Sequence, residues 1–167
     1  PVMLKATNGG GGRGIRRCDN EKEMDSNFDR VISEATKAFG SPEIFIEKCV
    51  LTPKHIEVQV LADQHGNVIH LFERDCSIQR RNQKLIEIAP SPQLSEEQRN
   101  YIGHLAVKAT KAVNYENAGT VEFLLDSDDN FYFMEMNTRL QVEHTVTETI
   151  TGIDIVQEQI RIASGIF

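Results

Sequence analysis

Hydrophobic and polar residues recur with different periods along this chain, and the changes of period predict its elements. Apolar residues repeat at helical spacing over 20–39 and 95–114, and each run starts at a residue typical of an N-cap, Asn20 or Ser95. Alternation with period two, or short apolar runs between turn residues, predicts strands at 1–6, 43–50, 55–63, 68–72, 119–126 and 131–143. We therefore expect an α+β fold, an antiparallel sheet with helices on one side, and a last short helix near Asp154.

The segment 131–143 is the most informative of these predicted strands. Read as a strand, it places Glu135, Asn137 and Arg139 on one face, at the end of an otherwise apolar run. Burying a carboxylate and a guanidinium is costly unless each has a partner. A metal ion and an anionic ligand would supply such partners, whereas an edge strand with one solvated face is the alternative.

A four-residue turn joins this segment to the preceding strand and predicts how the two pair. If Asp126 lies opposite Phe131, counting inward brings Glu122 opposite Glu135 on the same face. Facing carboxylates repel unless a cation lies between them, and Asn137 adds an amide oxygen nearby. Oxygen ligands of this kind suit Mg²⁺, with Mn²⁺ as a possible substitute.

Two other stretches have the composition of anion sites. The glycine run 7–14 lies between strand-like pieces and is flanked by Lys5 and Arg13, so its backbone N–H groups can approach a phosphate. The segment 73–90 interleaves arginines and Lys84 with amide side chains, which suits phosphate or bicarbonate. A flexible hairpin and a solvated charge run are the respective alternatives.

Composition limits the remaining possibilities. Of 167 residues, 40% are hydrophobic and 26% charged, and the net charge of −7 argues against nonspecific nucleic-acid binding. Neither a membrane-spanning run nor a signal peptide is visible, so no membrane partner is expected. Cys18, Cys49 and Cys76 show no metal-type spacing, which favours reduced thiols in a cytosol-like compartment. The chain opens in a strand without Met, and we expect it to be part of a larger protein.

Six motifs in one order carry a family resemblance: GGGGRG, EIFIEK, KHIEVQVLAD, ERDCSIQRRNQK, GTVEFL and FMEMNTRLQVEH. Together they resemble the ATP-binding core of biotin carboxylase, an ATP-grasp ligase, over essentially the whole chain. That branch includes the biotin carboxylase subunits of acetyl-CoA carboxylase and the corresponding domains of pyruvate, propionyl-CoA and urea carboxylases. The resemblance implies an ATP-grasp fold, with a small glycine-lid subdomain at 1–50 and a large subdomain with the Mg-ATP and bicarbonate site at 51–167. It also implies that the family's N-terminal and C-terminal domains lie outside these residues.

The resemblance further implies roles for individual residues. Those expected to contact ATP are Lys5, Gly9, Gly10, Gly11, Gly12, Arg13, Gly14, Glu47, Lys48, Val50, His55, Gln79 and Asn82. The expected Mg²⁺ ligands are Glu122, Glu135 and Asn137, in agreement with the pairing inferred above. The bicarbonate site would comprise Lys84, Arg139, Gln141 and Val142, with Glu143 as the general base. Asn82, Ile88 and Thr145 depart from the commoner family residues and look more like pyruvate-carboxylase-type sequences.

The implied reaction carboxylates biotin through carboxyphosphate, formed from ATP and bicarbonate. The implied partners are a biotin carboxyl carrier protein or domain and a carboxyltransferase, within a homo-oligomeric parent enzyme. The compartment would be the cytoplasm, or the mitochondrial matrix for a eukaryotic acyl-CoA or pyruvate carboxylase. Two alternatives stay open: another ATP-grasp ligase, such as half of a carbamoyl-phosphate synthetase or a purine-pathway carboxylating enzyme, and a noncatalytic nucleotide-binding module. The fragment alone is expected to be weakly active or inactive.

Overall fold

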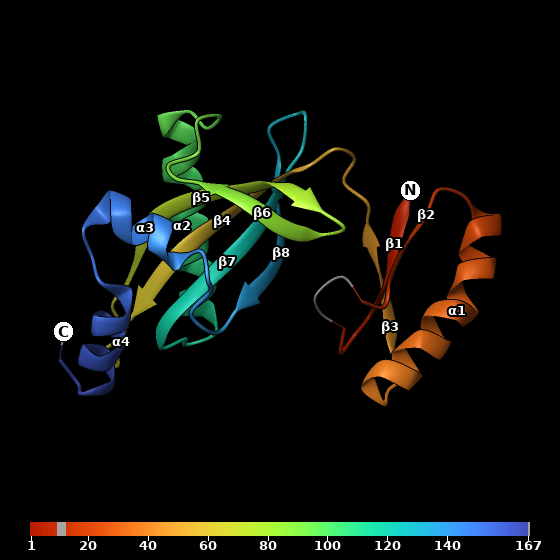
Figure 1. Ribbon diagram of the computed structural model, residues 1–167, viewed down its shortest axis with the longest axis horizontal. Helices are drawn as coiled ribbons and strands as arrows, with labels where there is room; N and C mark the ends of the chain where they lie inside the picture. The colour runs from red at the N-terminus through yellow and green to blue at the C-terminus, as the bar shows by residue number, and fades with distance from the viewer. Residues whose placement is uncertain (10–12, 167) are drawn as a thin grey trace. The chain divides into compact units, whose positions relative to one another are not determined.

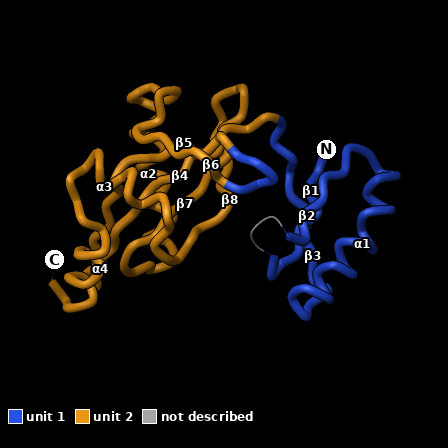
Figure 2. The backbone as a smooth tube through the Cα atoms, viewed as in Figure 1, with its two compact units in different colours: residues 1–51, 79–83 blue, residues 52–78, 84–167 orange. Residues whose placement is uncertain are grey.

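A computed structural model describes residues 1–9 and 13–166 of the chain (Figure 1). Gly10, Gly11 and Gly12 of the predicted glycine loop lie outside the described residues. The chain divides into two compact units, one of residues 1–51 and 79–83 and the other of the remaining residues (Figure 2). No described helix combines the length and the apolar character that crossing a bilayer requires.

The first unit is a three-stranded antiparallel sheet with one long helix beside it. Its elements are β1 (Val2–Ala6), β2 (Ile15–Cys18), α1 (Glu21–Phe39) and β3 (Ile44–Lys48), with strand order β2-β1-β3. The side chain of Asn20 accepts a hydrogen bond from the backbone N–H of Glu23, so the predicted N-cap is confirmed. Val31 of α1 packs on Leu4 and Cys18 to form a small core.

The second unit is a five-stranded antiparallel sheet with three helices. Its elements are β4 (Lys54–Ala62), β5 (Val68–Arg80), β6 (Gln83–Ile88), α2 (Glu96–Ala112), β7 (Asn117–Leu125), β8 (Phe131–Asn137), α3 (His144–Thr151) and α4 (Ile155–Ala163). The strand order is β6-β5-β4-β7-β8. Ser95 caps α2 through the predicted capping box, and Asp154 caps α4.

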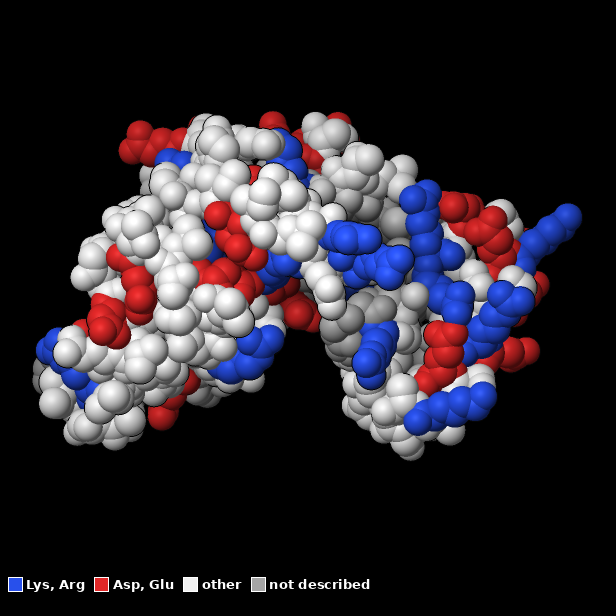
Figure 3. Space-filling view, in the orientation of Figure 1, with Lys and Arg blue, Asp and Glu red and all other residues white. Residues whose placement is uncertain are grey.

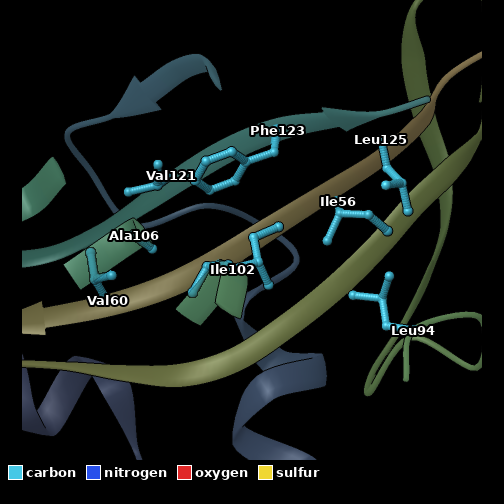
Figure 4. Packing of buried hydrophobic residues seen from close by; sticks show 9 residues of the cluster. Ile56, Val60, Leu94, Ile102, Ala106, Val121, Phe123 and Leu125 are labelled. Carbon is cyan, nitrogen blue, oxygen red and sulfur yellow. The ribbon is translucent and has the colours of Figure 1, made fainter. Parts of the chain in front are cut away.

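Apolar residues of the second unit pack on both faces of its sheet. On one face, Ile56, Val58 and Val121 pack against Ile102 of α2, in the cluster shown in Figure 4. A second cluster joins Leu61, Leu71 and Ala118 to Ile155 and Ile162 of α4. Leu61 and Val60 are neighbours on β4 and point to opposite faces, so helices cover both sides of the sheet. The expectation of helices on one side only was therefore wrong.

A β-bulge decides the register between β7 and β8. Leu125, rather than the predicted Asp126, lies opposite Phe131, so the counting from the turn was wrong by one residue. The register then shifts between Glu122 and Phe123, and this shift returns Glu122 to its predicted partner Glu135. The predicted pairing of the two carboxylates is confirmed. It depends on a β-bulge that the sequence pattern does not predict.

Two other segments contain structure that the sequence pattern did not predict. The polar segment 73–90 forms the end of β5 and the hairpin strand β6, and Arg81 and Asn82 make the turn with φ values of 53° and 61°. The predicted strand 131–143 ends at Asn137, and an unpredicted helix, α3, begins at His144. That helix is rich in threonine and contains a valine, which favour strands, so residue propensity alone would not predict a helix there.

Candidate active site

Four charged side chains form one row across the sheet of the second unit. Arg74 of β5 pairs with Glu57 of β4, Glu57 pairs with Glu122 of β7, and Glu122 pairs with Glu135 of β8. Directly opposed residues share a face, so the row lies on the face away from α2. Arg74 and Glu57 are 0% exposed and Glu122 is 3% exposed, so this part of the charged row is buried.

Lys84 of β6 joins three carboxylates of this face. Its Nζ atom lies 2.8 Å from Oε1 of Glu122 and 2.7 Å from Oε1 of Glu143, and it also forms an ion pair with Glu57. Burial by itself disfavours the charged ammonium, but the charges of Glu57 and Glu122 outweigh this cost and raise the pKa of Lys84. Lys84 is therefore a permanent cation at the centre of the cluster.

The carboxylate of Glu122 is surrounded by hydrogen-bond donors. Nε2 of His55 lies 2.7 Å from Oε2, while Oε1 accepts from Nδ2 of Asn137 at 2.9 Å and Nε2 of Gln141 at 3.1 Å. Burial alone would raise the pKa of Glu122, but the hydrogen bond with His55 and the charge of Lys84 outweigh it and lower the pKa. Glu122 is thus held as a carboxylate at neutral pH.

Glu143 precedes the first turn of α3 and faces the same ammonium. Burial would raise the pKa of this carboxyl, but the hydrogen bond from Lys84 and its charge lower it. The side chain of Glu143 is 10% exposed, so it lies near the surface of the cluster. An ionised carboxylate that neighbours a cation can accept a proton from a bound acid and keep the resulting anion close to positive charge.

The predicted metal ligands fit Mg²⁺ by the chemistry of their donors. Glu122 and Glu135 supply carboxylate oxygens from adjacent strands, and Asn137 supplies an amide oxygen, which accepts a hydrogen bond from Nη2 of Arg139 at 3.3 Å. Ligand atoms of His55, Glu57 and Glu122 also lie within 4.8 Å of one another. Since Asn137 turns its amide nitrogen toward Glu122, we expect its side chain to rotate when it binds a metal ion.

The predicted residues that belong to the second unit are His55, Lys84, Glu122, Glu135, Asn137, Arg139, Gln141, Val142 and Glu143. Arg139 and Val142 follow the end of β8 and are exposed, with Val142 at 90%. Arg139 lies in a loop rather than in the predicted strand, but it still contacts Asn137. The loop 138–143 therefore presents these side chains beside the sheet.

The other predicted residues that the structure describes belong to the first unit: Lys5, Gly9, Arg13, Gly14, Glu47, Lys48, Val50, Gln79 and Asn82. Lys5 forms an ion pair with Glu47 across β1 and β3. Gly14 has φ of 69°, and an added Cβ would lie 2.8 Å from Cβ of Ala6, so this position requires glycine. On the face shown in Figure 3, lysine and arginine side chains gather over the first unit.

Sequence reasoning missed two residues of the cluster. From the sequence, Glu57 was given no role, and Arg74 counted only among the arginines of the segment 73–90. The alternation of β4 does place Glu57 on the polar face, next to Gln59, which is also 0% exposed. The alternation shows that Glu57 and Gln59 share one face of β4. It does not show that this face is buried, because the segments that cover it are distant in the sequence.

A comparison with protein families matches residues 1–167 to the family described as carbamoyl-phosphate synthase L chain, ATP binding domain. The chain belongs to this family. Among curated relatives, it is 63% identical over 165 residues to the 2-oxoglutarate carboxylase small subunit of Hydrogenobacter thermophilus, covering 99% of this chain and 35% of that protein. It is 58% identical to biotin carboxylase 2 of Bacillus subtilis, covering 99% of this chain and 37% of that protein.

Solved structures confirm the resemblance to biotin carboxylases and the ATP-grasp fold. The biotin carboxylase domain dimer of Hydrogenobacter thermophilus 2-oxoglutarate carboxylase, in complex with MgADP, ADP and bicarbonate, matches with a TM-score of 0.95 and 63% identity, over 99% of this chain and 36% of that one. A biotin carboxylase complex with a β,γ-ATP ligand from Campylobacter jejuni matches with a TM-score of 0.98 and 53% identity, over 100% of this chain and 37% of that one. The chain thus spans little more than a third of these relatives.

Proposed function

We propose that this chain is the ATP-binding portion of a biotin carboxylase, which uses ATP and bicarbonate to carboxylate biotin on a carrier protein. The observation that carries the proposal is the position of Lys84 between Glu143 and Glu122, at 2.7 Å and 2.8 Å. Two carboxylates and a cation thus lie in one cluster, and in this proposal Glu143 is the general base and Glu122 a metal ligand. The Hydrogenobacter relative, whose structure contains MgADP and bicarbonate, supports it.

In the proposed reaction, Glu143 removes the proton of bicarbonate while Lys84 and Arg139 hold the anion. The deprotonated bicarbonate oxygen attacks the γ-phosphorus of ATP, the bond to ADP breaks, and carboxyphosphate forms. Carboxyphosphate decomposes to CO₂ and phosphate, the phosphate takes the N1′ proton of biotin, and that nitrogen attacks CO₂. Glu122, Glu135 and Asn137 would hold Mg²⁺, which neutralises charge on the phosphoryl oxygens.

The remaining predicted residues serve nucleotide binding in this proposal. Residues 1–50 form a small lid subdomain and 51–167 the large subdomain with the Mg-ATP and bicarbonate site. The lid would cover the phosphates through Lys5 and the glycine run, while Glu47, Lys48 and Val50 lie against adenine. Water exclusion by such a lid protects a labile intermediate.

We also propose the wider setting of the parent enzyme. A biotin carboxyl carrier protein or domain brings biotin, and a carboxyltransferase receives the carboxyl group. A homo-oligomeric parent is supported by the dimer of the Hydrogenobacter domain. The compartment is the cytoplasm, or the mitochondrial matrix if the parent resembles the rat methylcrotonoyl-CoA carboxylase subunit, which is named as mitochondrial.

Calorimetric titration of the chain with ATP, with and without Mg²⁺, tests the proposal. We expect Mg²⁺-dependent binding that Glu135→Gln weakens, because the variant removes a charged oxygen ligand. Glu116→Gln is the matched control, since Glu116 is an exposed carboxylate next to β7. Titration of the nucleotide-bound chain with bicarbonate, at constant ionic strength, then tests the second substrate. A folded chain that binds neither ligand would contradict the proposal.

The family description favours one second candidate, a carbamoyl-phosphate synthase half that also activates bicarbonate with ATP. The two candidates share the first phosphorylation and differ in the nucleophile that follows. ADP release that depends on ammonia rather than on biotin, in the full-length protein, would support the synthase. ADP release that depends on biotin would support the carboxylase.

A further inference from the structure

A buried arginine links the charged row of the sheet to the loop that carries the proposed bicarbonate residues. We propose that Arg74 is a positioning residue, which fixes Gln141 and the first turn of α3 and thereby holds Glu143 and the loop 138–143 in their binding geometry. The expected effect on bicarbonate binding rests on the proposed function, whereas the contacts of Arg74 do not depend on it.

The guanidinium of Arg74 is completely buried and uses all three of its nitrogens. Its five acceptors come from β4, β7, the loop 138–143 and α3, and they are Glu57, Gln59, Thr120, Gln141 and Thr147. Arginine offers five N–H donors and no acceptor, so these contacts account for every donor. A buried cation that is paired in this way fixes the relative positions of the segments that supply its acceptors.

The contact with Gln141 determines which way its amide points. Nη2 of Arg74 donates to Oε1 of Gln141 at 3.2 Å, and Nε2 of Gln141 donates to Oε1 of Glu122 at 3.1 Å. Because a guanidinium can only donate, it must face the oxygen of this amide. The NH₂ group is then directed at the carboxylate. Arg74 therefore sets the side-chain orientation of a residue that we place in the bicarbonate site.

The contact with Thr147 attaches α3 to the sheet. Nη1 of Arg74 donates to Oγ1 of Thr147 at 2.8 Å, and Thr147 is fully buried. Glu143 is the N-cap residue of α3, one turn earlier, and Nδ1 of His144 donates to the carbonyl oxygen of Gln141 at 2.7 Å. Both ends of the segment 141–147 thus depend on the same guanidinium.

Glu57 extends this influence to Lys84. Nε of Arg74 donates to Oε1 of Glu57 at 2.6 Å, while the other oxygen of Glu57 forms the ion pair with Lys84. Arg74 compensates part of the negative charge of the cluster and holds Glu57 toward the ammonium. Without Arg74, Glu57 would lose one of its two ion pairs among the described residues and keep the one with Lys84.

Arg99 provides a matched control elsewhere in the same unit. Nε of Arg99 donates to Oε1 of buried Glu73 at 2.8 Å, and its Nη2 donates to the carbonyl oxygen of Ser91 at 3.2 Å. Arg99 belongs to α2, away from the loop 138–143. Its loss should therefore destabilise the fold without altering the proposed site.

The experiment compares Arg74→Lys, Arg74→Met and Arg99→Met in the 167-residue chain. Amide hydrogen exchange gives the protection of 141–147, and sodium bicarbonate titration against sodium chloride gives the affinity in the presence of MgATP. We expect both Arg74 variants to lose protection of 141–147 about tenfold or more relative to the rest of the sheet. Bicarbonate affinity should fall roughly 10- to 100-fold, since small misplacements of binding groups have effects of this size. MgATP affinity should change less than threefold.

Arg74→Lys decides the result if Arg74→Met does not fold, because lysine keeps the charge but cannot reach all five acceptors. Unchanged protection of 141–147 in Arg74→Lys would overturn the proposal, as would equal losses in Arg99→Met. If the wild-type chain binds neither MgATP nor bicarbonate, the proposed function fails; with or without bicarbonate binding, the exchange data decide whether Arg74 orders this segment.

Discussion

The ammonium of Lys84 lies 2.7 Å from the carboxylate of Glu143, although 59 positions separate the two residues in the chain. The same ammonium contacts Glu122 and Glu57, so one cation balances part of the charge of three carboxylates. An ion pair buried to this degree is costly to break from one side, because the remaining charges lose their partner.

Replacing Lys84 by methionine should raise the pKa of Glu143 and destabilise the chain by about 3 kcal/mol, since three carboxylates lose their shared cation. Carboxyl carbon shifts of labelled glutamate, followed during an acid titration, would measure the pKa, and urea denaturation would measure the free energy of unfolding. Lys108→Met, which removes an exposed lysine of α2, is the control and should change neither quantity appreciably. A Glu143 pKa that is the same with and without Lys84 would contradict this electrostatic account.

His70 should make the stability of the chain depend on pH. Burial and the neighbouring His104 lower its pKa below the ordinary 6.5, whereas Glu73 partly opposes them. As the pH falls below 6.5, the unfolded chain therefore takes up a proton before the folded chain does, and stability decreases. His70→Phe should flatten this dependence between about pH 7.5 and 5.5. Urea denaturation at several pH values provides the measurement, and an unchanged pH slope in the variant would argue against His70 as its source.

Replacing Gly103 by alanine should destabilise the chain, whereas the same substitution at an ordinary helix glycine stabilises. Alanine in a helix interior usually stabilises by about 1 kcal/mol relative to glycine. At Gly103, however, the added Cβ would lie 2.6 Å from Nε2 of His70, so we expect Gly103→Ala to destabilise by about 1 kcal/mol or more.

A double-mutant cycle separates this clash from other effects. In a His70→Ala background, Gly103→Ala should become neutral or stabilising, because the ring is gone. Thermal unfolding of the four chains gives the coupling between the two sites. Equal effects of Gly103→Ala in both backgrounds would show that the close contact is not the cause.

Asn82 should tolerate glycine but not a β-branched residue. Its φ of 61° lies in the left-handed region at the β5–β6 turn, where asparagine and glycine are accommodated best. We expect Asn82→Gly to be close to neutral and Asn82→Val to destabilise by about 1–2 kcal/mol. Arg80→Val is the control, since Arg80 is the exposed last residue of β5. Urea denaturation measures the free energy of unfolding of each variant. Equal destabilisation by valine at positions 80 and 82 would show that the left-handed backbone at Asn82 is not the cause.

Features that depend on neighbours along the chain could be predicted from the amino-acid sequence. The helix caps at Asn20 and Ser95 need only the following three residues, and both are confirmed. The alternation of β4 identified its apolar face correctly, because side chains of a strand point to opposite faces in turn. Pairing across a short turn also brought Glu122 opposite Glu135, with the bulge compensating an error of one residue.

The burial of polar groups and the identity of their partners depend on contacts between segments far apart in the chain. Alternation showed that Glu57 shares a face with Gln59, but not that α3, α4 and the loop 138–143 cover that face. The partners of Arg74 come from positions up to 73 residues away, and no local pattern encodes such a contact. Helix α3 forms although its threonines and Val146 favour strands, since packing of Thr147 against the sheet outweighs weak local propensity. The sequence therefore indicated which polar residues share a strand face, whereas their burial and mutual orientation follow from long-range packing.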